Sequence, residues 1–244
     1  MEIALNDLDW YWFKGNGVSG RLLQDVCLFR SHVLFDGGTR ENFGNEGANF
    51  GDIQYTDFES YHIVACVKDE ILGVVRITPP RSETVAWSVL GKDRYLQLLD
   101  GLETDLNHVI EINRLMIDRR IRKLNLGRTL MYAAIALIHQ QWDRSAMTII
   151  GSAGNLTKQA AFFLNYTDYE RVPGVSDTFA STFKDDITFL RYRMPPYTKG
   201  VEWFEFFKQE FRKPSTPSFA SFRMGYEEFT IDQNESRNRP EPTA

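Results

Sequence analysis

One continuous segment, residues 109–138, constrains the fold more than any other part of this chain. It begins with a β-rich run, VIEINRLMI, passes through a short basic turn, and continues into a stretch where apolar residues recur every three or four positions. That recurrence predicts a helix with one buried face. A buried strand that turns directly into an amphipathic helix is typical of α/β proteins. We therefore expect residues 109–117 to form a strand and residues 126–142 to form a helix.

Hydrophobic patterns on both sides extend this unit. They predict, in chain order, a helix at 20–35, a hairpin at 61–77, a strand at 84–90, a short helix at 92–102, a strand at 147–151, a helix at 155–166 with Asn155 as its N-cap, a strand at 187–194 and a helix at 203–211. This order predicts an α/β fold whose mixed, twisted sheet is flanked by helices.

The chain length fits one generous domain, because 244 residues can bury a sizeable core. We expect a single domain over residues 1–230. Within it, residues 1–60 hold the first helix and a long glycine-rich loop, and residues 175–230 form a C-terminal extension. The polar, proline-containing tail at 231–244 is predicted to be disordered.

Composition removes several classes of function. The formal net charge of −5 and the lack of an arginine-rich run argue against general nucleic-acid binding. Because the sequence has no run of about 18 apolar residues and its first residues are acidic, we expect a cytoplasmic protein without a membrane span or signal peptide. Both cysteines lie in apolar stretches and read as reduced core residues. Neither has metal-ligand spacing with a histidine, so we expect no metal site.

The basic turn has the pattern Arg-x-x-Asn-x-Gly, from Arg122 to Gly127. Backbone N–H groups at the start of a helix are unpaired and carry partial positive charge, so a loop around that end can bind a pyrophosphate. Asn125 and Gly127 are residue types that tolerate the left-handed backbone such a loop needs. The alternative is a basic helix start that only covers the end of a strand.

This segment resembles the acyl-coenzyme A signature of GNAT acyltransferases, with Asn125 where the first glycine is usual. Residues 154–172, GNLTKQAAFFLNYTDYERV, resemble the last motif of the same family. The resemblance implies two splayed central parallel strands, 109–117 and 147–151, with the pantetheine arm between them. It also implies a set of donor-binding residues: Leu115, Met116, Ile117, Arg122, Lys123, Leu124, Asn125, Leu126, Gly127, Arg128 and Asn155. Where the family often has a tyrosine as acid for the leaving thiolate, this chain has Phe162 and Phe163, with Tyr166 one turn later.

A second resemblance is to the acyl-homoserine-lactone synthases and the related N-acyl amino acid synthases, a GNAT branch that takes acyl groups from acyl carrier protein. The residues that carry it are Arg30, Asp52, Asp57, Arg76 and the run Glu111-Ile112-Asn113-Arg114-Leu115. The family's Ser or Thr is replaced by Asn113. The resemblance implies that residues 1–60 contribute the acceptor side of the site.

These residues suggest a chemistry. Glu111 can act as general base toward an acceptor ammonium, and Asn113, on the same strand face, can orient a water or the acceptor. By strand alternation, Arg114 is expected to point to the opposite face. The arginines at positions 30, 76 and 114 can hold Asp52, Asp57 and an acceptor carboxylate. The alternatives are an ion-pair network that only fixes the N-terminal region, and surface carboxylates at positions 52 and 57.

Three functions remain open from the sequence. The first is an N-acyltransferase that moves an acyl group, expected to be fatty, from acyl carrier protein or acyl-coenzyme A onto an amine such as an amino acid or a small peptide. The second is an acyl-homoserine-lactone synthase that uses S-adenosylmethionine. The third is a non-catalytic module that binds acyl carriers. The expected co-substrate is the acyl thioester, without a tightly bound cofactor. Residues 119–128 offer an acidic carrier protein a basic patch.

Overall fold

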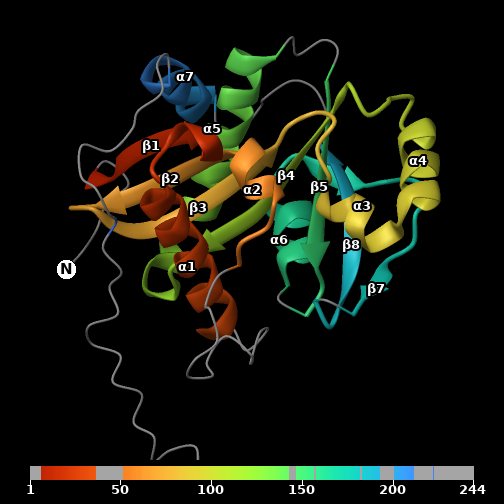
Figure 1. Ribbon diagram of the computed structural model, residues 1–244, viewed down its shortest axis with the longest axis horizontal. Helices are drawn as coiled ribbons and strands as arrows, with labels where there is room; N and C mark the ends of the chain where they lie inside the picture. Colours follow the sequence, from red (N-terminus) through yellow and green to blue (C-terminus); the bar gives the residue numbers. More distant parts are fainter. Residues whose placement is uncertain are drawn as a thin grey trace, which may run out of the picture.

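The computed structural model describes residues 7–36, 52–142, 147–156, 158–181, 183–192, 201–211 and 222. Within them, eight strands form one sheet in the order β1-β2-β3-β4-β5-β8-β6, and β7 pairs with β8 (Figure 1). The strands are β1 (Asp9–Lys14), β2 (Tyr61–Val67), β3 (Glu70–Thr78), β4 (Val109–Ile117), β5 (Thr148–Gly154), β6 (Tyr169–Arg171), β7 (Thr178–Ala180) and β8 (Asp185–Tyr192). Among the described strands, β4 and β5 are the parallel pair and the other pairs are antiparallel. The predicted mixed α/β sheet is confirmed.

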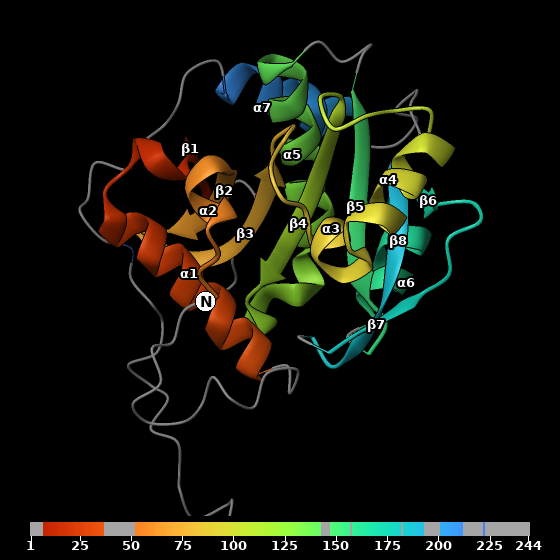
Figure 2. The same cartoon turned by 45° about the vertical axis from the view of Figure 1, so that its right-hand side comes forward.

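Helices cover both faces of this sheet. They are α1 (Gly20–Asp36), α2 (Thr56–Glu59), α3 (Val85–Leu90), α4 (Lys92–Gly101), α5 (Leu126–Gln141), α6 (Gln159–Tyr166) and α7 (Val201–Glu210), with 3-10 turns η2 (Gly15–Gly17) and η4 (Arg119–Leu124). Apolar residues of α5, α6 and α7 share one core cluster. On the opposite face, α1 packs on β1–β3, and α3 and α4 pack on β5 and β8. Figure 2 shows α1 and α3 in front of the sheet and α5 behind it. No described helix is long and apolar enough to cross a membrane.

Two local predictions are wrong. Residues 84–90, expected as a strand, form helix α3, because Thr84 caps it: its Oγ1 accepts the N–H of Trp87 at 3.0 Å. The helix expected at 155–166 begins only at Gln159, and its N-cap is Lys158 in the left-handed region rather than Asn155. The backbone N–H groups of Asn155 and of the following residue instead donate to Asp185 Oδ1, which turns the chain before the helix.

The strand β1 and the short helix α2 were not expected, and the other predicted elements agree with the structure. Four predicted parts form within a few residues of their expected bounds. They are the helix α1, the hairpin of β2 and β3, the central strand–turn–helix unit from β4 to α5, and the last helix, α7. The short strands β6 and β7 have three residues each and were not expected, since three residues give no period. Most of the predicted loop, residues 37–51, and the tail 231–244 lie outside the described residues.

The parallel pair β4 and β5 separates half-way along its length. Their pairing ends at Ile112 and Gly151, although β4 continues to residue 117 and β5 to residue 154. Opposite this point β4 carries a bulge against β3, with one extra residue between the partners of Val74 and Arg76. Arg114, at the bulge, has φ of 53°. A bulge bends the strand that carries it, so β4 turns away from β5 (Figure 2). The predicted splay of the two parallel strands is confirmed.

Candidate functional site

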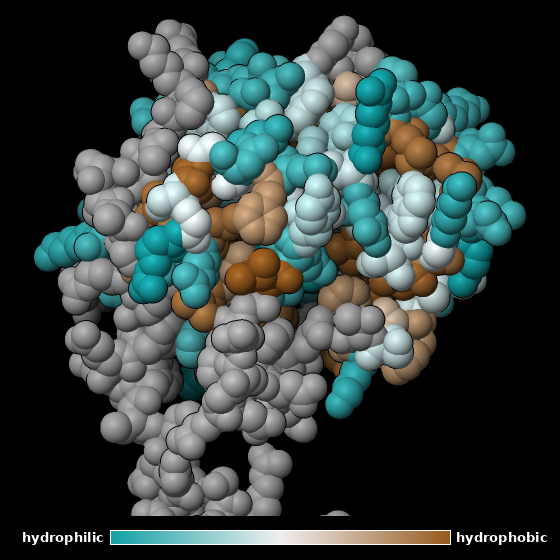
Figure 3. Space-filling view, viewed as in Figure 1, coloured by the Kyte–Doolittle hydropathy of each residue, from teal (hydrophilic) through white to brown (hydrophobic). Residues whose placement is uncertain are grey.

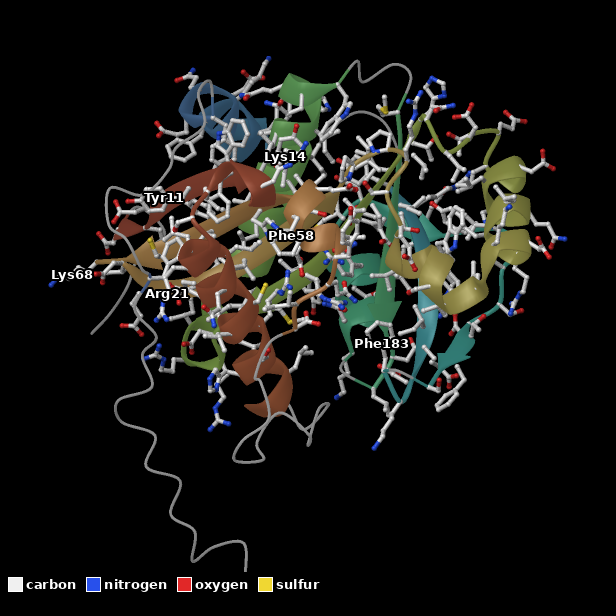
Figure 4. All side chains as sticks on the ribbon, in the orientation of Figure 1. Tyr11, Lys14, Arg21, Phe58, Lys68 and Phe183 are labelled. Atoms are coloured by element: carbon white, nitrogen blue, oxygen red, sulfur yellow. The ribbon has the colours of Figure 1, made fainter. Side chains whose placement is uncertain are left out.

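A cleft opens where β4 and β5 separate. Arg114 and Met116 of β4 line one side, and Ser152 and Gly154 of β5 line the other. Helix α6 contributes Gln159. The lining is completed by residues from four other segments: Leu34, Val85, Phe183, Asp185 and Ile187. Phe183 is labelled in Figure 4, in the turn just before β8. The cleft therefore lies at the splay, where the sequence predicts the donor arm.

Buried ion pairs border the cleft. Arg30 of α1 holds Asp57 of α2 with two hydrogen bonds of 2.8 Å, and Arg76 of β3 holds the same carboxylate at 2.7 Å. Arg30 and Asp57 are 0% exposed and Arg76 is 1% exposed. Asp52 joins this network, because its carboxylate is 3.2 Å from Arg30 and 2.6 Å from Arg114. Arg30 also donates to the backbone carbonyl of Asp52. The structure thus brings together all the charged residues expected on the acceptor side.

Shared charges shift the titration of this network. Burial by itself would raise the pKa of Asp57, but Arg30 and Arg76 outweigh it and hold that pKa well below its ordinary value. Burial lowers the pKa of Arg76 to about 10, and the charge of Arg114 adds to the shift. Burial and Arg30 lower the pKa of His62 to about 4. Arg30, Arg76 and Asp57 are therefore charged, and His62 is neutral, at neutral pH.

The expected orientation of Arg114 is wrong. Asn113 accepts from Arg76 through Oδ1 at 2.7 Å, and Arg114 pairs with Asp52, so both side chains meet the same ion-pair network. The reason is the left-handed backbone at Arg114, which interrupts the alternation of a regular strand. The guanidinium consequently lines the cleft, 5.5 Å from the centre of the Phe183 ring.

Glu111 is completely buried and accepts hydrogen bonds from four groups. Its Oε2 accepts from the backbone N–H of Val85 at 2.6 Å and from Asn113 Nδ2 at 2.8 Å. Its Oε1 accepts from the backbone N–H of Ala86 at 3.2 Å and from the hydroxyl of Ser152 at 2.6 Å. The carboxylate therefore sits at the N-terminus of α3, where unpaired N–H groups favour negative charge. With 0% of its surface exposed, Glu111 does not itself line the cleft.

Asn113 links the carboxylate to the arginine network. Its Nδ2 donates to Glu111 and, at 3.0 Å, to Thr78, while its Oδ1 accepts from Arg76. Asn113 is 4% exposed, so its hydrogen-bonding groups are directed into the protein. The side chain fixes the relative positions of Glu111 and Arg76.

The basic turn has the expected left-handed backbone at Asn125 but not at Gly127, which lies in the first turn of α5. Residues 119–124 form η4, Asn125 adopts the left-handed conformation with φ of 58°, and α5 begins at Leu126. A Cβ on Gly127 would lie 2.8 Å from Ile117 Cδ1 and 3.2 Å from Phe162 Cζ. Glycine is thus required there for close packing of α5 against β4 and α6. Of the basic residues predicted here, Arg128 is half-buried and donates to the Tyr132 hydroxyl at 3.0 Å. The side chains of Arg122, Lys123 and Leu124 lie outside the described residues.

Two other candidates are not among the residues that line the cleft. Asn155 accepts from Thr188 and donates to Asp177, and so fixes the turn before α6. Tyr166 is 64% exposed, with its ring 6.0 Å from that of Phe162.

Sequence reasoning missed Ser152 and Gln159, which both line the cleft. Gln159 Nε2 donates to the backbone carbonyl of Leu115 at 3.2 Å, on the part of β4 that β5 no longer pairs. Ser152 meets Glu111 across the splay. The only sequence signal for Ser152 was a polar residue directly after a short buried strand. No sequence signal pointed to Gln159, because it was placed inside the helix predicted at 155–166, and that helix in fact begins at Gln159.

The surface on the acceptor side is partly apolar. The side chains of Ile53, Tyr55 and Phe58, which follow Asp52 into α2, are exposed. Figure 3 shows apolar side chains near the middle of this face, where Figure 1 places α2 and Figure 4 labels Phe58.

No protein-family model matches the chain, and no curated protein sequence matches it. Solved structures do. A coenzyme A-dependent acyl-homoserine lactone synthase, BjaI, solved with SAM and isopentyl-CoA, matches with a TM-score of 0.55 and 12% identity over 85% of this chain and 91% of that one. The AHL synthase LasI matches with a TM-score of 0.52 and 14% identity over 80% and 92%. An acyl-CoA N-acyltransferase from Pseudomonas aeruginosa matches with a TM-score of 0.51 and 15% identity over 76% and 99%.

The chain has the GNAT fold. The resemblance to GNAT acyltransferases and acyl-homoserine-lactone synthases, predicted from the sequence, is confirmed at the level of the fold. The cleft lies in the centre of this fold, at the point where the pairing of β4 and β5 ends. The ion pairs that Arg30 of α1 and Asp57 of α2 form lie beside the cleft.

Proposed function

We propose that this protein is an N-acyltransferase that moves an acyl group from a phosphopantetheine thioester onto an amine. The observation that carries the proposal is the cleft that opens where the pairing of β4 and β5 stops. An unpaired strand edge can bind an extended, amide-containing arm as a further strand would bind. Phosphopantetheine is such an arm, and the basic start of α5 offers N–H groups for its phosphates.

The proposed donor site uses the free part of β4 and the turn after it. The Leu115 carbonyl, bonded by Gln159, is the acceptor group that an amide of the donor arm would take over. Met116 lines the cleft, and residues 117–128 lead from the strand to the helix start. Acyl-coenzyme A and acyl carrier protein present the same arm, so either fits. The acyl thioester is a co-substrate that binds, gives up its acyl group and leaves as the free thiol.

The proposed acceptor is an α-amino acid or a short peptide with a free amine. Arg114 lines the cleft beside Asp52, and a guanidinium can bind a carboxylate of the acceptor. The alternative is S-adenosylmethionine, which would make the protein a lactone synthase. The similarity in fold to BjaI, solved with SAM, favours keeping that alternative.

The test compares products in cells and with purified protein. Bacteria that express the chain are extracted, and the lipids are analysed by mass spectrometry against cells with an empty vector. A new N-acyl amino acid or N-acyl peptide supports the proposal, and a new acyl-homoserine lactone supports the alternative. Purified protein is then incubated with octanoyl-CoA or octanoyl-acyl carrier protein and a mixture of free amino acids, and thiol release is followed. No new product and no amine-dependent thiol release with either donor would favour a non-catalytic carrier-binding module.

A further inference from the structure

Ser152 connects the cleft with a carboxylate that the cleft does not reach. Its side chain lines the cleft, and its hydroxyl donates to Glu111 Oε1 at 2.6 Å. Glu111 itself is 0% exposed. An acceptor amine in the cleft therefore meets Ser152 and not Glu111.

The hydrogen bond to Glu111 also fixes what Ser152 can do. A serine hydroxyl has one hydrogen and two lone pairs, and here the hydrogen is given to the carboxylate. The remaining lone pairs can only accept, which suits an ammonium or amine N–H. Two other polar side chains of the cleft differ: Arg114 has no acceptor atom, and Gln159, whose amide N–H donates to Leu115, can accept an N–H only through a neutral amide oxygen, which does not pass a proton on.

Asp185 is the one carboxylate among the described residues that line the cleft. Its carboxylate can also accept an N–H, but Oδ1 already accepts two backbone N–H groups from the turn before α6. The charged groups around Ser152 are thus Glu111 and Arg114 of β4 and Asp185 of β8, and the phenol of Tyr95 on α4 faces Glu111.

We propose that Ser152 is a catalytic residue that accepts an N–H of the acceptor amine and passes a proton to Glu111. This rests on the proposed function. The ammonium gives one proton to Ser152 Oγ as the hydroxyl proton of Ser152 moves to Glu111 Oε1. The freed nitrogen lone pair attacks the thioester carbonyl carbon, and the C–S bond then breaks. The second proton lost by the nitrogen goes to the leaving thiolate, so the products are an amide and a thiol. Glu111 returns its proton to solvent through Ser152.

The lengths of the hydrogen bonds to Glu111 favour Oε1, rather than Oε2, as the oxygen that receives the proton. Oε2 is held by two short hydrogen bonds, of 2.6 and 2.8 Å, from Val85 and Asn113. At Oε1 the second donor, the N–H of Ala86, is 3.2 Å away, so protonation there costs a weaker hydrogen bond.

The test is the pH profile of Ser152→Ala with octanoyl-CoA and the amine that wild-type protein acylates. We expect turnover to fall by about 10²-fold at neutral pH, the lower end of what proton transfer contributes. The loss should shrink as the pH passes about 8, where a free α-amine loses its proton unaided. The affinity for octanoyl-CoA should stay unchanged. Ser152→Thr keeps the hydroxyl and should restore most of the turnover.

Two controls separate this role from a structural one. Ser88→Ala removes the hydroxyl of an exposed serine, which bonds the Val85 carbonyl within α3, and it should keep wild-type turnover at every pH. Asp185→Asn should leave the shape of the pH profile unchanged. Thermal unfolding of each variant shows whether it folds.

Three results would overturn the proposed proton transfer from the amine through Ser152 to Glu111. They are near-full turnover by folded Ser152→Ala at neutral pH, a loss of the same factor at every pH, and a pH-dependent loss in Asp185→Asn but not in Ser152→Ala. Wild-type protein without any amine-dependent thiol release is a different outcome, since it overturns the proposed function and this proton transfer with it.

Discussion

At the scale of single residues, one carboxylate holds much of the acceptor side together. Asp57 neutralises Arg30 from α1 and Arg76 from β3, and its backbone carbonyl lies 2.8 Å from His62 Nε2. Removing one partner from such a buried group leaves an uncompensated charge, which costs far more than an exposed pair does. The network therefore fixes α1 and α2 against the sheet beside the cleft.

His62 makes this region sensitive to acid. Its pKa is about 4 in the folded protein, against 6.5 for an unperturbed histidine, so the unfolded chain binds a proton that the folded chain does not. Stability is complete above pH 6.5, falls as the pH drops from 6.5 to about 4, and loses roughly 3 kcal/mol over that range. His62→Gln, which keeps a donor for the Asp57 carbonyl, should flatten this slope in urea unfolding measured at several pH values. Equal slopes in the two proteins would contradict the assignment.

At the scale of elements, the bulge of β4 decides the shape of the site. It separates β4 from β5 and turns Arg114 toward Asp52, and the close approach of α5 at Gly127 holds the far end of the strand. The bulge, the separation of the two strands and the start of α5 are therefore coupled. A substitution that changes how α5 packs on β4 should also change the shape of the cleft.

Gly127→Val tests this unit. Its Cβ would meet Ile117 at 2.8 Å and Phe162 at 3.2 Å, and the two further methyl groups must displace them. We expect about 1–3 kcal/mol of destabilisation from overpacking, measured by urea unfolding, together with weaker binding of octanoyl-CoA in calorimetry. Gly101→Ala, at the end of α4 with nothing within 4 Å of the added Cβ, is the matched control. Unchanged stability and donor affinity in Gly127→Val would refute the packing role.

At the scale of the whole molecule, the cleft and the C-terminal helix lie on opposite sides of the sheet. Phe204 and Phe207 of helix α7, and Phe211 directly after it, share a core cluster with α5, while α1 and α3 are on the side of the cleft (Figure 2). A substitution in α7 should therefore lower the free energy of unfolding without lowering the turnover of the folded protein.

Phe207→Ala should lower the free energy of unfolding by about 3–5 kcal/mol, because the ring is fully buried and packs on Trp10 and Phe211. Its neighbour Phe206 is 40% exposed, so Phe206→Ala on the same helix should cost much less. Turnover below the unfolding temperature should be near wild type in both. A loss of turnover in Phe207→Ala while it is still folded would show that α7 supports the cleft after all.

Local patterns along the chain were enough to predict several parts of this protein. Period and turn chemistry predicted the strand at 109–117, the left-handed Asn125 and the helix after it, and the structure has all three. The resemblance to a known family named the arginines and carboxylates of the acceptor side, and the structure brings them into contact.

Other features depend on residues that are far apart in the chain and meet only when it folds. Residues 85–90 are helical with the help of Thr84 and of Glu111, which lies 26 positions later than Val85 and binds the first N–H groups of α3. Arg114 faces Asp52 because a bulge against β3 resets the strand's alternation. Ser152 meets Glu111 because β4 and β5 are adjacent in the sheet and separate just beyond them. Such hydrogen bonds join residues far apart in the chain, so no local period records them.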